Sequence, residues 1–233
     1  MRYTVYPVHT LLCEPPRGAA VVIDTLRMTT VAATALESGC SSVRTAATVE
    51  EATRLARQTG ALRGGERSAV KIPGFDLSNS PLEYTPERLK GRPLILTTSN
   101  GTQAVASAEG APRLYLGCLR NVGALADRLR GEEEVAFVLA GTAGRFSLED
   151  ALTAGALLGR LPSGEMDDMA VAALALYRQN RSRLHELLAP CAHYRRLMAL
   201  GYGEDLRFCL QEDCSRAVPL RLPGEEAFRA ARA

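Results

Sequence analysis

The chain has 233 residues, of which 46% are hydrophobic and 23% charged, and its formal net charge is +2. This is the composition of a globular protein that is long enough to bury its own core. The mild charge, the lack of tryptophan and the 5% aromatic share argue against nucleic acid as a partner, because that function needs a concentrated basic face or stacking platforms. No apolar run resembles a signal peptide or a membrane span. No two of the six cysteines form a C-x-x-C pair, so we expect a cytoplasmic protein with reduced thiols and no membrane partner.

Short runs rich in valine, isoleucine and leucine alternate with segments of helical pattern. The predicted strands cover residues 3–8, 19–24, 42–45, 61–64, 93–98, 113–117, 135–141 and 217–222. The predicted helices cover residues 29–38, 49–58, 102–108, 122–130, 148–159, 168–179 and much of 182–200. This alternation favours an α/β fold, with a mostly parallel or mixed central sheet flanked by helices in three layers.

We expect one α/β domain over residues 1–233, with two closely packed lobes that divide near residues 90–110 as the alternative. The tail at residues 224–233 follows a proline and is expected to be frayed. An alanine-rich segment at residues 169–176 packs either internally or against a second copy, so a homodimer is one expectation.

Several well-known catalytic motifs do not occur in the chain. There is no Walker A loop and no G-x-G-x-x-G string. Asp24 is followed two residues later by Leu26, whereas an aspartyl-phosphatase motif has a second aspartate there. No cysteine precedes an arginine at the spacing of a cysteine phosphatase. We expect His185 and His193 to be surface or packing residues.

The first candidate site segment follows the apolar run at residues 21–23. Asp24 can bind a hard cation there, and Arg27 can bind a phosphate or sulfonate. Thr29 and Thr30 lie near the start of a helix, where backbone N–H groups favour an anion. The alternative is that Asp24 only caps the helix and Arg27 lies on the surface.

The second candidate segment is an irregular stretch at residues 64–81. Glu66 and Asp76 are candidate metal ligands, and Arg67 is a candidate anion contact. Asn79 and Ser80 add neutral donors and acceptors. Connections of this length are usually functional or disordered, and we expect an ordered, functional loop rather than a solvated one.

Two further candidate segments follow later strands. Residues Ser99, Asn100, Gly101 and Thr102 form a turn before a helix, and an Asn-Gly pair tolerates positive φ and can turn N–H groups toward an anion. Residues 141–150 contain two glycines, Arg145, and the acidic pair Glu149 and Asp150. An ordinary glycine turn with acidic residues in a first helical turn is the alternative there.

The candidate segments share one chemistry, because ligands of open α/β sheets bind at the carboxyl ends of strands. Together they supply carboxylate oxygens, arginines and oriented N–H groups with almost no histidine. Oxygen ligands suit Mg²⁺ better than zinc or copper. The sequence therefore favours metal-assisted transfer of a phosphoryl group from a small anionic substrate to water.

These same segments resemble motifs of the 2-phosphosulfolactate phosphatase family. The strings are VVIDTLRMTT, GERSAVKIPGFDLSNSPLEY, TTSNGT and GTAGRFSLED, and they occur in the family's order over most of the chain. Met28 and Ser78 depart from the family pattern, which has alanine and glycine at those positions. The resemblance implies Mg²⁺-dependent hydrolysis of (2R)-phosphosulfolactate to sulfolactate and phosphate, as a step of coenzyme M biosynthesis.

These observations give a specific set of expected roles. We expect Asp24, Arg27, Glu66 and Asp76 to be catalytic, and the Mg²⁺ ligands to come from Asp24, Glu66, Asp76, Glu149 and Asp150. The phosphate or sulfonate contacts are expected from Arg27, Thr29, Thr30, Arg67, Asn79, Ser80, Ser99, Asn100, Gly101, Thr102 and Arg145. The attacking group is a metal-activated water, with Asp24 itself as the alternative. The rival functions are a phosphatase of a different small phosphometabolite and a protein that binds an anionic metabolite without turning it over.

Overall fold

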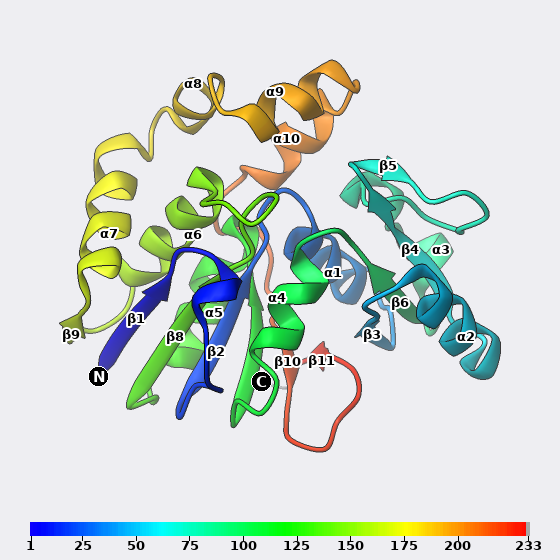
Figure 1. Ribbon diagram of the computed structural model, residues 1–233, viewed down its shortest axis with the longest axis horizontal. Helices are drawn as coiled ribbons and strands as arrows, with labels where there is room; N and C mark the ends of the chain where they lie inside the picture. The colour runs from blue at the N-terminus through cyan, green and yellow to red at the C-terminus, as the bar shows by residue number, and fades with distance from the viewer. Residues whose placement is uncertain (232–233) are drawn as a thin grey trace.

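The computed structural model describes residues 1–231 and contains two β-sheets flanked by helices (Figure 1). The strands are β1 (Arg2–Tyr6), β2 (Ala19–Ile23), β3 (Ser42–Thr45), β4 (Leu62–Arg67), β5 (Val70–Lys71), β6 (Pro93–Thr97), β7 (Arg113–Gly117), β8 (Glu134–Leu139), β9 (Glu165–Met166), β10 (Pro219–Arg221) and β11 (Arg229–Ala230). The α-helices are α1 (Met28–Glu37), α2 (Val49–Thr59), α3 (Pro86–Leu89), α4 (Gly101–Ser107), α5 (Val122–Leu129), α6 (Leu148–Leu158), α7 (Asp168–Asn180), α8 (Leu184–Leu188), α9 (Ala192–Ala199) and α10 (Gly203–Cys209).

The larger sheet has the strand order β11-β10-β7-β2-β8-β1-β9. Strands β7, β2, β8, β1 and β9 are parallel, and β10 pairs in antiparallel fashion with both β7 and β11. The smaller sheet has the order β3-β6-β4-β5, in which only β5 is antiparallel. The predicted α/β fold with a mostly parallel or mixed sheet is confirmed.

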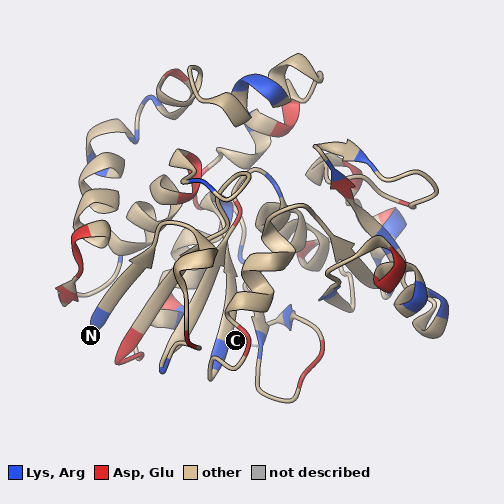
Figure 2. Ribbon diagram, viewed as in Figure 1, with Lys and Arg blue, Asp and Glu red and all other residues tan. Residues whose placement is uncertain are grey.

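Alternate residues of the central strands pack into different layers, because successive side chains of a strand point to opposite faces. Val21 and Ile23 pack with α5, α6 and α7 on one face. Ala20 and Val22 pack with α1, α4 and the smaller sheet on the other. Charged residues on the larger sheet lie mainly where its strands begin (Figure 2). The predicted three-layer arrangement is therefore present, and the opposite ends of the strands are left for the site.

The smaller sheet is built from residues 42–97, after which the chain returns to the larger sheet. Helix α2 covers its outer face through Leu55, which packs with Ile95. The C-terminal segment joins both sheets, because Val43 and Phe228 pair in antiparallel fashion and Phe228 is fully buried. The expected frayed tail is thus wrong for residues 224–231, and residues 232–233 lie outside the described part. The division into lobes stays a prediction.

The structure differs from two of the predictions. Residues 64–81, expected as one irregular loop, begin inside β4 and turn back through β5. Residues 182–200 contain α8 and α9, and the sequence did not predict the following α10. These three helices lie above the carboxyl ends of the parallel strands (Figure 1). Within residues 1–231, no helix has the length and apolar character needed to cross a bilayer.

Candidate active site

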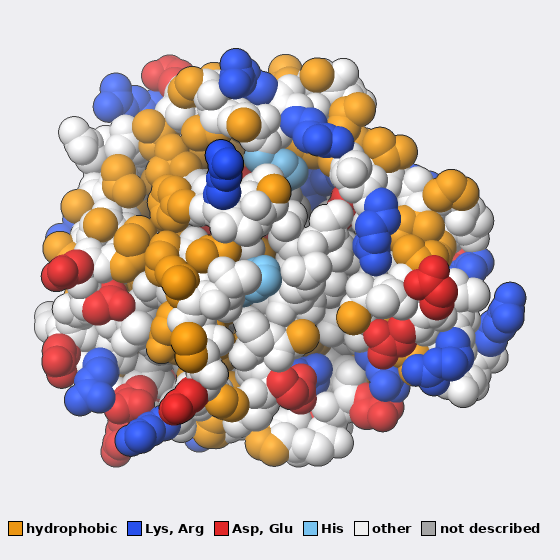
Figure 3. Space-filling view, viewed as in Figure 1, with side chains coloured by type: hydrophobic (Ala, Val, Ile, Leu, Met, Phe, Trp, Pro, Cys, Tyr) orange, Lys and Arg blue, Asp and Glu red, His pale blue; other side chains and the backbone are white. Residues whose placement is uncertain are grey.

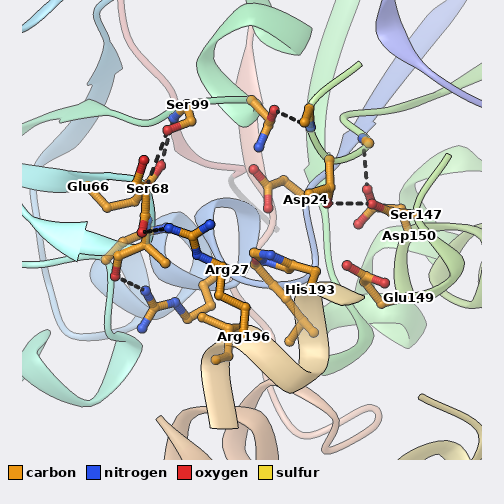
Figure 4. A pocket seen from close by; sticks show the side chains of 18 residues that line it. Asp24, Arg27, Glu66, Ser68, Ser99, Ser147, Glu149, Asp150, His193 and Arg196 are labelled. Carbon is orange, nitrogen blue, oxygen red and sulfur yellow. Dashed lines mark hydrogen bonds between the residues drawn. The ribbon is translucent and has the colours of Figure 1, made fainter. Parts of the chain in front are cut away.

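The ends of four parallel strands and helix α9 surround one pocket of about 320 Å³. Asp24 follows β2, Glu66 lies near the end of β4, Ser99 follows β6, and Gly141 follows β8. Figure 4 shows the labelled side chains of these segments converging from both sheets. The pocket is lined by Asp24, Leu26, Arg27, Glu66, Ser68, Ala69, Asn79, Ser99, Asn100, Gly141, Thr142, Ala143, Ser147, Glu149, Asp150, His193, Arg196 and Leu197.

Asp24 is buried at the floor of this pocket and lies against Gly101 of α4. Its Oδ1 accepts a bond of 3.4 Å from the Met28 backbone N–H. A Cβ added to Gly101 would overlap Asp24 Oδ2 and would lie 2.7 Å from Met28 Cε. Neither Asn100 nor Gly101 has a positive φ, so this turn does not use the conformation that an Asn-Gly pair tolerates. The glycine is needed because the Asp24 carboxylate occupies the space of a side chain.

Burial raises the pKa of Asp24 to about 6. His193 lowers this pKa, whereas the negative charges of Glu66 and Glu149 raise it further. Burial also raises the pKa of Glu149, and it raises that of Asp150 well above its ordinary value. A nearby opposite charge favours the ionised form of a carboxyl group, so a cation bound among these buried acids would lower their pKa values.

Glu66 holds two segments of the pocket wall together. Its Oε1 accepts a bond of 2.7 Å from the Ser99 N–H, and its Oε2 accepts one of 2.6 Å from the Ala69 N–H. Ser68 and Ala69 form the β4–β5 turn with φ values of 54° and 68°. Non-glycine residues are uncommon in this left-handed region and persist where contacts hold them. Glu66 therefore fixes the turn that faces the pocket.

Arg27 is almost completely buried and is held by the C-terminal helices. Its Nη1 bonds Asp205 of α10 at 2.5 Å, and its Nη2 donates to Ala69 O at 3.1 Å. Its guanidinium lies 4.0 Å from the centre of the Tyr202 ring. Ser80 donates to the other Asp205 oxygen at 2.8 Å. Because an arginine has five N–H groups, Arg27 keeps donors for a ligand while its position is fixed.

The family model described as 2-phosphosulpholactate phosphatase matches residues 8–222, which include every segment of this pocket. The chain belongs to the 2-phosphosulfolactate phosphatase family. It is therefore a phosphoric monoester hydrolase by family, as the sequence predicts. Three relatives named probable 2-phosphosulfolactate phosphatase support this result. Proteins of Caldanaerobacter subterraneus, Symbiobacterium thermophilum and Thermotoga petrophila are 45%, 44% and 41% identical. Their alignments cover 85%, 88% and 91% of this chain and 86%, 92% and 93% of theirs.

The carboxylates of this family member differ in how many oxygens are free for a metal. Asp150 accepts bonds from the Thr25 and Gly141 N–H groups at 2.9 and 3.1 Å, so both of its oxygens are engaged. Asn79 Oδ1 is buried against the pocket without a hydrogen-bond partner. Within residues 1–231, no three His, Cys, Asp or Glu side chains gather closely enough to form a complete metal site. Mg²⁺ commonly uses one or two carboxylates, with waters and substrate oxygens as its other ligands. Asp24 and Glu149, whose charges interact, and the unpartnered Asn79 Oδ1 line the pocket and are ligands of that kind.

Several residues expected in the site of this phosphatase family member lie outside the pocket. Asp76 is exposed, and its Oδ2 accepts from the Arg63 N–H at 2.8 Å, so the expected catalytic and metal roles are corrected. Arg67 turns away toward Thr97 Oγ1 at 2.9 Å, and Arg145 is exposed. Four hydroxyl groups bond within the protein instead of lining the pocket, and they belong to Thr29, Thr30, Ser80 and Thr102.

Two lining residues with ionisable side chains were not identified from the sequence as site residues. His193 of α9 was expected to be a surface or packing residue, but it lines the pocket and its Nε2 lies 2.8 Å from Leu26 O. Arg196 lies one turn further along α9, and its Nη2 donates to Ser68 O at 2.9 Å. The only sequence signal was their spacing of three residues, which places two side chains on one helical face.

Proposed function

We propose that this protein hydrolyses 2-phosphosulfolactate to sulfolactate and phosphate in an Mg²⁺-dependent reaction at the pocket of Asp24 and Arg27. The observation that carries the proposal is the convergence of the family's segments on this one pocket, where buried acids lie beside a buried arginine. Carboxylates and a guanidinium are the groups that bind a divalent cation and a phosphate together.

Asp24, Glu149 and Asn79 are the residues proposed to hold Mg²⁺. When bound, the ion would neutralise phosphate charge and lower the pKa of a bound water. The expected contributions of Glu66 and Asp150 change, because both carboxylates accept backbone N–H bonds that position the pocket wall. We propose that these two carboxylates position the pocket wall and do not bind the metal directly.

Arg27 is proposed to bind the phosphate oxygens, because Asp205 and Ala69 O fix its guanidinium and leave N–H groups for the ligand. Ser99 and Asn100 line the same pocket and supply neutral polar contacts. Asn100 Oδ1 also accepts from the Ala143 N–H at 3.2 Å, which joins the segments after β6 and β8. Water is proposed as the attacking group, and attack by Asp24 is the alternative. The stereochemical course at an isotopically chiral phosphate distinguishes them, since one displacement by water inverts the configuration at phosphorus, whereas two displacements through an aspartyl phosphate retain it.

The test is phosphate release from a panel of small phosphoesters, with Mg²⁺ and with a chelator. Metal-dependent release from 2-phosphosulfolactate, at a higher kcat/KM than from the other esters, is the expected result. A higher kcat/KM for another ester would indicate that a different phosphometabolite is the substrate. Tight binding without release would favour the non-catalytic alternative.

The assembly and location of the protein are proposed separately. We propose a homodimer, because Val171 of α7 is exposed and hydrophobic side chains gather where β1 and α7 lie (Figure 3). Light scattering checks this proposal. The proposed cytoplasmic location follows from the family's small metabolite substrate.

A further inference from the structure

Arg196 is the one arginine of the pocket lining that forms no ion pair within residues 1–231. Arg27, the other lining arginine, is paired with Asp205, and both side chains are buried. Arg196 is exposed at the pocket edge and bonds only the Ser68 carbonyl at 2.9 Å. Its charge is therefore available to an anion that enters the pocket.

The position of Arg196 is set by the core beneath α9. Leu197, the next residue, is fully buried and packs with Leu26, Ala69 and Leu206. His193, one turn earlier, contacts Leu26 O. Helix α9 is thus attached to the two segments that carry Arg27 and the β4–β5 turn, and Arg196 remains beside the pocket mouth.

The β4–β5 turn places the two arginines close to each other. Arg27 donates to the Ala69 carbonyl and Arg196 donates to the Ser68 carbonyl, and these are consecutive residues. The two guanidinium groups therefore bind neighbouring carbonyls of one short turn (Figure 4). A small molecule with two acidic groups joined by a few carbon atoms matches that arrangement.

We propose that Arg196 binds the substrate's second acidic group, a sulfonate or carboxylate, while Arg27 binds the phosphate. Arg196 is then a specificity-determining residue that selects phosphoesters carrying another acid. This assignment rests on the proposed function of the pocket. Guanidinium groups form paired hydrogen bonds with such oxyanions, and a hydrogen bond to a charged group contributes about tenfold or more to binding.

The test compares Arg196→Gln with Arg195→Gln. Arg195 is exposed on the same helix and does not line the pocket, so its variant removes the same charge elsewhere. The ratio of kcat/KM for 2-phosphosulfolactate to that for phenyl phosphate, which has no second acid, should fall about tenfold in Arg196→Gln. Most of the change should be in KM. Arg195→Gln should keep the wild-type ratio, and Arg196→Lys should recover part of it. An equal loss on both substrates, or an unchanged ratio, would overturn the assignment.

Calorimetric binding of sulfolactate separates this inference from the proposed function. The wild-type protein should bind sulfolactate about tenfold more tightly than Arg196→Gln does, whether or not it hydrolyses phosphosulfolactate. Hydrolysis together with identical sulfolactate affinity in both proteins would leave the function in place and reject the role of Arg196. If sulfolactate binding depends on Arg196 but phosphosulfolactate is not hydrolysed, the role of Arg196 is supported and the proposed function is rejected. A wild-type protein that does not bind sulfolactate would contradict the Arg196 proposal.

Discussion

Asp24 and Gly101 act as a pair, because the carboxylate occupies the volume that a side chain at position 101 would need. We predict that Gly101→Ala lowers kcat/KM by at least about a hundredfold, since small displacements of a reacting group have effects of that size. Gly131→Ala is the matched control, because nothing lies within 4 Å of its added Cβ. Steady-state kinetics of both variants checks the prediction, and equal activity would show that Asp24 tolerates displacement.

The negative charge of Asp24 is proposed to bind the metal ion. Asp24→Asn keeps the shape of the side chain but weakens the binding of a hard cation. We predict that phosphate release falls about a thousandfold at saturating substrate, a loss in the range seen when a catalytic group is removed. Asp127→Asn removes an exposed carboxylate that pairs with Arg130 and should keep normal activity. A folded Asp24→Asn protein with full Mg²⁺-dependent activity would remove Asp24 from the mechanism.

Helix α10 contributes to the site without entering it. Asp205 and Arg27 form a buried ion pair, and removal of one partner of such a pair leaves an uncompensated charge. We predict that Asp205→Asn lowers the free energy of unfolding by about 3 kcal/mol and also lowers kcat/KM. Glu204→Gln, which breaks an exposed pair with Arg207, should change stability by less than about 1 kcal/mol. Chemical denaturation of both variants measures the difference, and similar small losses would mean that α10 does not hold Arg27.

The strands and the acidic residues at their carboxyl ends could be predicted from the sequence. The site residues on the C-terminal helices α9 and α10 could not. Buried strands such as residues 19–23 have an unmistakable apolar pattern, and the acids that follow them fall at predictable strand ends. Asp205 and Arg196 lie on short helices whose docking depends on Leu197 and Leu206. Such long-range contacts have no local sequence signal. The prediction for Asp76 was wrong because its carboxylate accepts a hydrogen bond from the backbone of a nearby residue, Arg63, instead of facing the pocket. An acidic residue within a motif can have such a local role.

At the scale of the whole molecule, the buried acids link stability to pH. In the metal-free protein, the pKa of Asp24 is raised to about 6, so the folded state binds more protons than the unfolded state as pH falls toward about 4. The contribution of Asp24 to the free energy of unfolding therefore becomes more favourable as the pH falls from 7.5 to 5. Asp24→Asn should be more stable than the wild type by on the order of 2 kcal/mol at pH 7.5, and this difference should shrink at pH 5. Thermal unfolding at both pH values measures it, and a constant difference would contradict the origin of the effect.

Segments from both sheets and from α9 are proposed to surround one divalent cation and one anionic substrate. The most direct measurement is anomalous diffraction from a crystal containing Mn²⁺ in place of Mg²⁺, together with sulfolactate and phosphate. We expect a single metal peak within about 2.2 Å of an Asp24 carboxylate oxygen, with phosphate on Arg27 and sulfolactate beside Arg196. A metal bound outside this pocket, or a pocket that contains the anions while Asp24 binds no metal, would contradict it.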